Sequence, residues 1–258
     1  MHIKELMDLS GRVAVVTGGY GIYGAPISEG LAEAGAHVVI ASRSLDKCEA
    51  VAGQLRQRGL KASAEQYDQG DNASILQLRD KLLKEFGAVQ ILVNNSVGRA
   101  MRSFDDSADA WRKSMEVNAN GLFVISRAFI EPMMAAKSGS MINISSIQGV
   151  VAPAFDNYAG TKMTTPPDYH FHKHGMIGLT KYLAAFAGPY GVRVNAISPG
   201  GFQTEGHSEP FLSQYCRRTF LGRMAKHDDI KGAVVYLASD ASAYVTGHNL
   251  LLDGGYSV

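Results

Sequence analysis

The sequence contains few cysteines and almost no net charge. Its 258 residues include two cysteines, Cys48 and Cys216. Neither belongs to a CxxC pair or to a Cys/His cluster with zinc-ligand spacing, so we expect a reducing, cytoplasmic environment and no metal. The formal net charge of +1 gives no reason to expect nucleic acid or an anionic membrane as a partner.

The sequence also lacks a long hydrophobic segment. No uninterrupted apolar run reaches about 18 residues, the length that suggests a membrane span. Residues 1–10 are mixed in character and do not resemble a signal peptide. Hydrophobic residues make up 46% of the chain and charged residues 19%, which are ordinary values for a globular protein. Because no linker or repeat interrupts it, we expect one domain over residues 1–258.

Short apolar segments rich in Val and Ile alternate with amphipathic segments along the chain. The predicted strands are 13–17, 37–41, 63–67, 91–93, 140–144, 192–197 and 249–252. The predicted helices are 25–34, 45–58, 73–86, 108–118, 122–136, 169–187 and 233–237. This alternation predicts an α/β fold with a doubly wound, Rossmann-like parallel sheet that helices cover on both faces.

A glycine-rich turn, Thr17-Gly18-Gly19-Tyr20-Gly21-Ile22-Tyr23-Gly24, joins the first predicted strand to the first helix. Such a turn lets the main chain approach a pyrophosphate at a helix N-terminus, although a plain strand–helix turn is the alternative. The segment resembles the TGxxxGxG pattern of the short-chain dehydrogenase/reductase family. Thr17, Gly18 and Gly24 match that pattern, and Ile22 occupies the middle glycine position. The resemblance implies cofactor contacts from Gly18, Tyr20, Ile22 and Gly24.

Ser42-Arg43 follows the second predicted strand, where an acidic residue would bind a ribose 2′-hydroxyl. A hydroxyl followed by a guanidinium suits a 2′-phosphate instead, so NADP(H) is expected rather than NAD(H). The alternative is that Arg43 is a solvated surface charge. By resemblance to the family, the expected adenine contacts are Asp68 and Gln69, with ordinary loop polarity as the alternative for Asp68. Further cofactor contacts are expected from Asn94, Pro199, Gly200, Phe202 and Thr204, although Asn94 could instead bridge strands.

Two tyrosine–lysine pairs have the spacing of one helix face, Tyr158/Lys162 and Tyr169/Lys173. A nearby cationic lysine favours the phenolate and lowers the pKa of a tyrosine from about 10, which suits acid/base work. Tyr158 lies twelve residues after Ser146, close to the interval of the short family members.

The sequence around the second pair favours it. Two prolines at 166–167 would end a helix through Tyr158, and the same prolines are typical of a helix start. Residues 169–181 resemble the YxxxKxGxxGLTK segment of the family without a gap. We therefore assign Tyr169 and Lys173, and interpret Tyr158 as a loop aromatic near the substrate cleft.

The resemblance implies the remaining members of the catalytic set. Ser146 matches the Ser-x-x-Gly register and would hold the substrate oxygen, with Ser145 as the alternative. Asn118 matches the asparagine that supports a water relay to the lysine, while Asn120 is out of register. The expected catalytic residues are Asn118, Ser146, Tyr169 and Lys173. Both Tyr169 and Lys173 would also contact the cofactor.

Three histidines, His170, His172 and His174, follow Tyr169 in the sequence. Spacings of two residues place them on different helix faces, because a helical turn has 3.6 residues. We therefore expect no metal site among them.

Two segments are expected to shape the substrate cleft: a cap near residues 205–222 and an inserted loop at 151–167. The expected substrate is a small carbonyl compound or secondary alcohol. The C-terminal Gly247–Gly255 segment resembles the TGxxxxxDGG ending of family members that form homo-oligomers, tetramers or dimers. Two rival functions are a redox-inactive nucleotide-binding protein and a sugar-nucleotide-modifying enzyme.

Overall fold

The alternating segments build one fully parallel sheet. In the computed structural model, which describes residues 1–258, seven strands lie in the order β3-β2-β1-β4-β5-β6-β7. The strand order reverses between β1 and β4, as in a doubly wound Rossmann-like fold. The predicted fold class is thereby confirmed. The strands are β1 Val13–Thr17, β2 His37–Ser42, β3 Ala62–Gln66, β4 Ile91–Asn94, β5 Gly139–Ile144, β6 Val192–Pro199 and β7 Asn249–Leu252.

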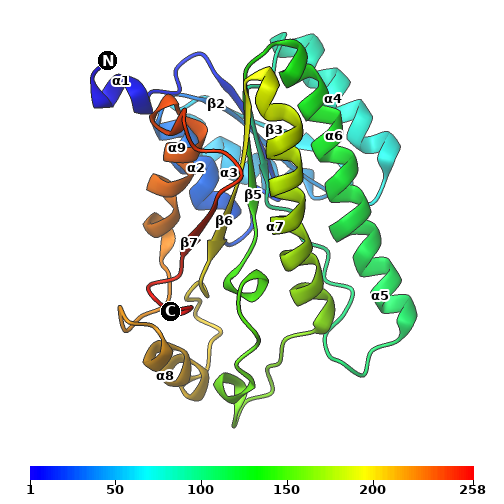
Figure 1. The fold of residues 1–258 in the computed structure, drawn as a ribbon, viewed down its shortest axis with the longest axis vertical. Coiled ribbons are helices and arrows are strands. Elements are labelled where there is room, and N and C mark those ends of the chain that lie inside the picture. The colour runs from blue at the N-terminus through cyan, green and yellow to red at the C-terminus, as the bar shows by residue number, and fades with distance from the viewer.

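Helices cover both faces of this sheet (Figure 1). Helices α2 (Gly24–Glu33), α3 (Leu45–Gln57) and α9 (Lys231–Ala238) pack on one face. Helices α4 (Asn72–Phe86), α6 (Leu122–Ala135) and α7 (Pro167–Ala187) pack on the other. All residues of β1 and β4 are buried, which explains why these strands read as continuous apolar runs.

Local sequence signals set the ends of the helices. Asp71 caps α4 by accepting a hydrogen bond from the main-chain N–H of Ala73, and Gly87 ends the helix with a φ of 77°. Helix α7 begins at Pro167, as the two prolines predict. No helix in the structure combines the length and the hydrophobicity that a membrane crossing requires.

The two helices predicted at 108–118 and 122–136 are joined rather than separate. Helix α5 (Ala108–Met115) continues through a π-helical segment, Glu116–Gly121, into α6. Gly121 permits this packing, because a Cβ atom there would lie 2.0 Å from the main-chain oxygen of Gln69. Two further helices, α1 (Ile3–Met7) and α8 (Glu209–Arg218), were not predicted.

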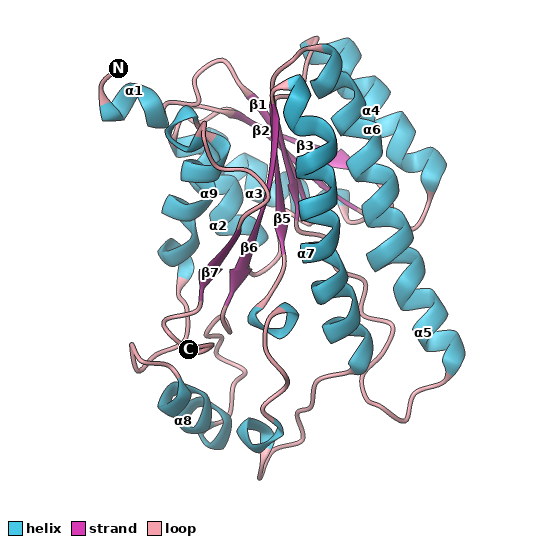
Figure 2. Cartoon of the chain, in the orientation of Figure 1, coloured by secondary structure: helices cyan, strands magenta, loops and turns pink.

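The inserted loop and the predicted cap lie together below the carboxyl ends of the strands (Figure 2). The loop forms a short 3-10 turn, Phe155–Tyr158, and Tyr158 stacks on Phe211 of α8 with ring centroids 5.6 Å apart. Arg218 of α8 forms an ion pair with Asp156 of the loop. The insertion is thus a packed wall against α8.

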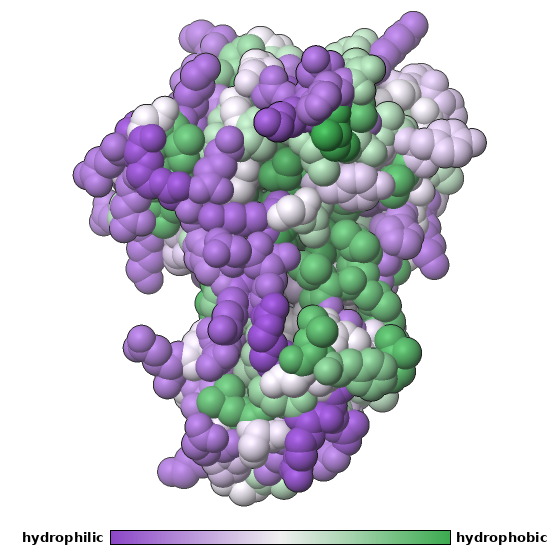
Figure 3. All heavy atoms as spheres, turned by 90° about the vertical axis from the view of Figure 1, so that its left-hand side faces the viewer, coloured by the Kyte–Doolittle hydropathy of each residue, from purple (hydrophilic) through white to green (hydrophobic).

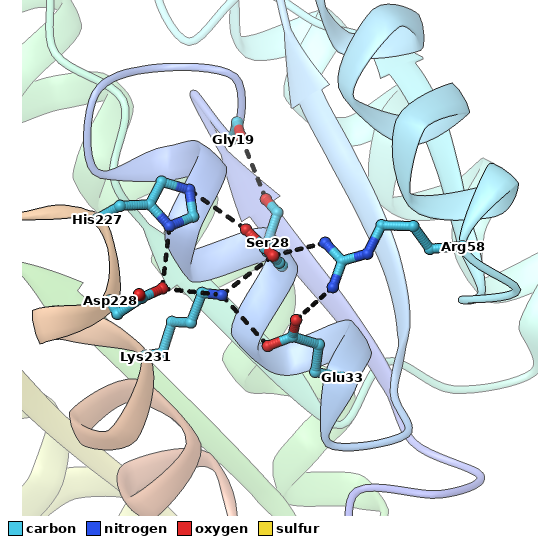
Figure 4. A network of polar contacts seen from close by, with 8 residues as sticks. Gly19, Ser28, Glu33, Arg58, His227, Asp228 and Lys231 are labelled. Carbon is cyan, nitrogen blue, oxygen red and sulfur yellow. Dashed lines mark hydrogen bonds and ion pairs between the residues drawn. The ribbon is translucent and has the colours of Figure 1, made fainter.

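A cluster of charged side chains ties α2 to α3 and α9 on one face of the molecule (Figure 4). The Lys231 ammonium lies 3.0 Å from Glu29 and 3.1 Å from Asp228, and Arg58 lies 2.5 Å from Glu29. Burial alone would raise the pKa of Glu29, but hydrogen bonds from Arg58 and Lys231 outweigh it and leave the pKa below its ordinary value. Two cations therefore share the Glu29 carboxylate.

We expect the Lys231→Met variant to lower the free energy of unfolding at pH 7 by about 1 kcal/mol, since networks of partly buried charges exceed isolated surface pairs. A carboxylate with a lowered folded-state pKa stabilises the protein above its unfolded pKa, and this contribution is lost as pH falls through the folded pKa. The difference between wild type and variant should therefore shrink below pH 4.5, the ordinary pKa of Glu29. Urea unfolding at several pH values measures this difference in the free energy of unfolding, with Lys84→Met as the control. An equal effect of Lys84→Met would contradict the prediction.

Candidate active site

A cavity of about 370 Å³ opens at the carboxyl edge of the sheet. The segments that follow strands β1 to β6 all contribute to its wall, and the strand order reverses within this stretch. Ligands of open α/β sheets bind at such a reversal. The predicted residues on the wall are Gly18, Tyr20, Ile22, Ser42, Arg43, Asp68, Gln69, Ser146, Tyr169, Lys173, Pro199 and Gly200.

The glycine-rich turn is tightly closed on itself. A Cβ atom on Gly24 would lie 2.1 Å from the main-chain oxygen of Gly18, so only glycine fits there. Gly18 has a φ of 60°, whereas Ile22 does not adopt a positive φ. Ile22 therefore needs no glycine conformation, and its half-exposed side chain lies on the cavity wall. Tyr23 donates a hydrogen bond of 2.7 Å to the carbonyl of Gly200, which joins this turn to the end of β6.

Polar and basic side chains gather where β2 ends. Ser42, Arg43 and Tyr20 line the cavity, and Arg43 is exposed. The Lys47 ammonium stands 5.5 Å from the centre of the Tyr20 ring. Arg43 therefore places a cation on this part of the wall, where the end of β2 bears no carboxylate, and Lys47 contacts Tyr20 without lining the cavity itself.

The buried Gln69 connects two other segments of the wall. It accepts a hydrogen bond of 3.0 Å from the Tyr67 hydroxyl and donates one of 2.9 Å to the carbonyl of Val117. Asp68 lies beside it on the wall, and its carboxylate accepts from the main-chain N–H of Gly70 at 2.9 Å.

Of the two asparagines near the end of β4, Asn95 and not the predicted Asn94 lies on the cavity wall. Asn94 is buried away from the cavity, and its side-chain amide donates to Asn143 on β5 and to Ser126 on α6. Asn95 lies on the cavity wall instead and donates to the carbonyls of Thr17 and Gly18. The structure thus gives Asn94 a position between strands and gives Asn95 the contact with the glycine-rich turn.

Ser146, Tyr169 and Lys173 meet on the cavity wall where β5 ends. The Lys173 ammonium donates a hydrogen bond of 2.6 Å to the carbonyl of Ile144 and stands 5.6 Å from the centre of the Tyr169 ring. The neighbouring Ser145 points away, donating to the carbonyl of Lys173 at 2.9 Å. Gly149 allows this approach, because a Cβ there would lie 2.7 Å from that carbonyl oxygen.

Burial shifts both titratable groups of the pair toward their neutral forms. It raises the pKa of Tyr169 and lowers that of Lys173 to about 7. The Ser146 hydroxyl and the Arg99 guanidinium oppose the rise in the Tyr169 pKa. Desolvation outweighs both groups, so the pKa of Tyr169 stays above its ordinary value.

The first tyrosine–lysine pair does not form a comparable site. Tyr158 belongs to the inserted loop, and its hydroxyl accepts a hydrogen bond of 3.3 Å from Gln148. Lys162 is exposed to solvent in the same loop. No helical face brings these two residues together, because the 3-10 turn ends at Tyr158.

Asn118 lies in the π-helical segment, and its side chain is fully engaged. Its oxygen accepts from the main-chain N–H of Gly98 at 2.8 Å. Its amide donates to the carbonyl of Gly98 at 2.8 Å and to the Ser114 hydroxyl at 3.0 Å. The side chain thus holds the loop after β4 in place, and Asn118 is not among the residues that line the cavity.

The three histidines have three separate environments. His172 is buried against the Tyr169 ring at 5.2 Å, and burial lowers its pKa to about 3. His170 lies 3.3 Å from the Thr165 hydroxyl, and the exposed His174 contacts the carbonyl of His170. Nowhere in residues 1–258 do three His, Cys, Asp or Glu side chains come together as a metal site would require.

Several positions differ between the predicted and the observed wall. Gly24, Phe202 and Thr204 lie beside the cavity rather than on it, and Phe202 packs edge-on against Tyr23 at 5.2 Å. Further wall residues lie at or after the ends of predicted strands, a signal that could have identified them. Tyr67 is the last residue of the predicted strand 63–67, and the segment after the predicted strand 91–93 adds Asn95, Ser96, Val97, Gly98 and Arg99.

Comparisons with known proteins cover the full length of the chain. A family model described as enoyl-(acyl carrier protein) reductase matches residues 20–257. Gluconate 5-dehydrogenase of Gluconobacter oxydans is 31% identical over 100% of this chain and 99% of its own length. D-threitol dehydrogenase of Mycolicibacterium smegmatis is 34% identical over 97% of this chain and 94% of its own.

A solved structure shares both the fold and the sequence pattern. The crystal structure of a gluconate 5-dehydrogenase from Burkholderia cenocepacia, in complex with NADP and tartrate, superposes with a TM-score of 0.89. It is 34% identical, and the match covers 99% of each chain. The chain therefore belongs to the short-chain dehydrogenase/reductase family of NAD(P)-dependent oxidoreductases, which interconvert alcohols and carbonyl compounds.

Proposed function

We propose that this protein is an NADP(H)-dependent enzyme that interconverts a secondary alcohol and a ketone on a small polyhydroxylated substrate, a polyol or a sugar acid. The observation that carries the proposal is the meeting of Ser146, Tyr169 and Lys173 at one end of a cavity whose other end holds Ser42 and Arg43. A dinucleotide laid across the ends of the strands would have its nicotinamide at the first group and its adenosine at the second.

The wall of the cavity fits such a cofactor. The turn closed by Gly24 places main-chain N–H groups at the start of α2, where a pyrophosphate is favoured. Arg43 and Lys47 provide two cations for a 2′-phosphate, and no carboxylate at the end of β2 opposes it. When bound, the nicotinamide supplies or accepts the hydride, and the protein supplies orientation and proton transfer.

The proton chemistry falls to residues of this chain. In the direction of reduction the Tyr169 phenol donates its proton to the carbonyl oxygen, while the Ser146 hydroxyl holds that oxygen by a hydrogen bond. The raised pKa of Tyr169 keeps the phenol protonated for this step, and Arg99 stabilises the phenolate that the step leaves behind. Lys173 holds its place beside the Tyr169 ring through the carbonyl of Ile144.

Two observations support the substrate class. The relatives are named for gluconate and D-threitol, both small polyhydroxylated compounds. Arg99 is exposed beside the reacting phenol, where a guanidinium suits a carboxylate or hydroxyl groups of a substrate. Helix α8 and the inserted loop, which pack on each other, would close the other side of the cleft as the cap.

The rival functions have less support from the site. A redox-inactive nucleotide-binding protein has no need of a buried lysine held beside a tyrosine. A sugar-nucleotide-modifying enzyme needs room for a second nucleotide, and the insertion together with α8 fills that side of the cleft. Neither arrangement is excluded by the fold, because one fold hosts many functions.

We also propose that the protein forms a homo-oligomer. Helices α6 and α7 carry exposed aromatic side chains, among them Phe123, Phe171, Tyr182 and Phe186. Further exposed hydrophobic side chains, Phe220, Leu221, Leu251 and Val258, lie toward the C-terminus, and Figure 3 shows a hydrophobic area beside the polar surface. Exposed patches of this kind mark surfaces that bind other chains.

Substitution of the proton donor tests the proposed chemistry. Tyr169→Phe should lower kcat by at least about 100-fold, because the general acid is lost, while NADPH binding is kept. Tyr158→Phe serves as the matched control and should stay within about threefold of wild type. NADPH oxidation with a panel of keto-polyols and keto-sugar acids measures both. A loss confined to Tyr158→Phe would contradict the assignment of the catalytic tyrosine.

The cofactor preference depends on the cations at the end of β2. Arg43→Ala and Lys47→Met should each weaken NADPH binding by about five- to tenfold, since each removes one charge-assisted contact with the 2′-phosphate. The affinity for NADH, which lacks this phosphate, should change less than about twofold in either variant. Fluorescence titration of the nucleotides measures these constants. Equal losses for NADPH and NADH would argue against a 2′-phosphate site.

The aromatic face of α7 provides a test of assembly. Tyr182 and Phe186 are 65% and 51% exposed, and their rings stack at 6.3 Å. Tyr182→Glu should dissociate the oligomer into smaller species, because a carboxylate would be buried without a partner. Tyr244→Glu, at a fully exposed tyrosine outside this face, should leave the assembly unchanged. Analytical ultracentrifugation reports the mass, and a monomeric wild type would refute the proposal.

A further inference from the structure

A buried carboxylate stands directly before the catalytic tyrosine. Asp168 is the second residue of α7, and only 2% of its surface is exposed. One of its oxygens, Oδ2, accepts a hydrogen bond from the hydroxyl of Ser114 on α5, which is itself fully buried. The other oxygen, Oδ1, has no hydrogen-bond partner in the protein. No step of the proposed reaction uses this group.

The carboxylate is the end point of a chain of hydrogen bonds that begins at the cavity. The Asn118 amide donates to the Ser114 hydroxyl at 3.0 Å, and that hydroxyl donates in turn to Asp168. Asn118 also bonds the main chain of Gly98 in both directions at 2.8 Å. Along the path from the Gly98 N–H through Asn118 and Ser114, each group donates toward Asp168, and the path links the loop after β4 to the first turn of α7.

The place of Tyr169 in the helix explains why such a link is needed. Tyr169 is the third residue of α7 and follows the long inserted loop. The first turn of a helix frays readily, because its N–H groups have no partners within the helix. Pro166, at the N-cap position, makes no side-chain hydrogen bond to this turn. Without a tertiary contact, the phenol would not keep one position relative to Ser146.

A buried carboxylate at this position lowers the stability of the fold, so stability alone does not account for it. A buried carboxylate with an unpartnered oxygen loses hydration that a single hydrogen bond does not replace. The helix N-terminus offsets part of this loss, since a negative charge is favoured there. The imidazole of His172, one turn along the helix, brings no positive charge, because burial lowers its pKa to about 3.

We propose that Asp168 is a positioning residue for the reaction: through Ser114 and Asn118 it clamps the first turn of α7 and so fixes the phenol of Tyr169 against the substrate oxygen. The inference rests on the proposed function in taking Tyr169 as the proton donor. The clamp itself is a property of the fold and can be measured without turnover.

The test compares four single variants and one double variant of the full-length protein. Asp168→Ala and Ser114→Ala each break the link, whereas Asp168→Asn keeps an oxygen that accepts from Ser114. Asp109→Ala is the control, because Asp109 is an exposed acid in the first turn of α5. Hydrogen exchange is followed at the amides of Phe171, His172 and Lys173, which in an α-helix bond to the carbonyls of the first turn.

We expect exchange at these three amides to rise about tenfold in Asp168→Ala and Ser114→Ala, while the C-terminal half of α7 is unchanged. The value of kcat should fall about 10- to 100-fold, as for a misplaced catalytic group, with KM and the NADPH dissociation constant within about twofold. Asp168→Asn should recover most of kcat, and the double variant Ser114→Ala/Asp168→Ala should lose no more than either single variant.

Three results would overturn the inference. Unchanged exchange in Asp168→Ala would show that no clamp exists, and raised exchange with an unaltered kcat would show that the clamp does not position Tyr169. If kcat falls together with a comparable rise in KM, weaker cofactor binding and a lower free energy of unfolding, Asp168 is a merely structural residue. A wild type that turns over no substrate would instead refute the proposed function, and the exchange measurement would still decide whether Asp168 holds the helix.

Discussion

The hydrogen bond from the Lys173 ammonium to the carbonyl of Ile144 joins helix α7 to the end of strand β5. The lysine is 2% exposed, and a buried ammonium without a partner would be strongly unfavourable. The helix can therefore occupy only positions in which this bond is made. The hydrogen bond from the Ser145 hydroxyl to the carbonyl of Lys173 also joins α7 to the end of β5. Gly149 permits this close approach, because it has no side chain. Because Tyr169 lies one turn earlier on the same helix, these contacts bring it to the side of the sheet where Ser146 lies, and the link from Ser114 to Asp168 then holds its own turn in place.

Much of the fold can be read from the sequence because burial on two faces leaves a strong pattern. Strands such as Val13–Thr17 have no polar face, and only a parallel sheet between two helical layers buries them completely. The link between α5 and α6 could not be read in this way. The π-helical segment depends on Asn118 bonding Gly98 and on the close approach of Gly121 to Gln69, which are contacts between residues distant in sequence. Helix α8 was missed for a related reason, since it is stabilised by packing on the inserted loop.

The candidate site likewise contains residues that the sequence predicts and residues that it does not. The family pattern placed Ser146, Tyr169 and Lys173 on one wall, and the two prolines before Tyr169 correctly marked the start of its helix. The pattern could not distinguish Asn94 from Asn95, because neighbouring strand-end residues point in opposite directions and only the pairing of β4 with β5 decides between them. It also gave no sign of Arg99, whose effect on the Tyr169 pKa depends on distance in space alone.

The site lies at the edge of both hydrophobic layers, to which its wall residues Ile144 and Tyr67 belong. Apart from Tyr67, the layers consist of apolar side chains that need no polar partner. The catalytic edge instead buries a lysine, a carboxylate and a neutral imidazole within two turns of one helix. Each of these groups loses hydration on burial, and the sheet and its two layers must provide the free energy that tolerates them. A polar cluster of this kind is retained where the reaction needs a phenol and a lysine held close together at a buried edge.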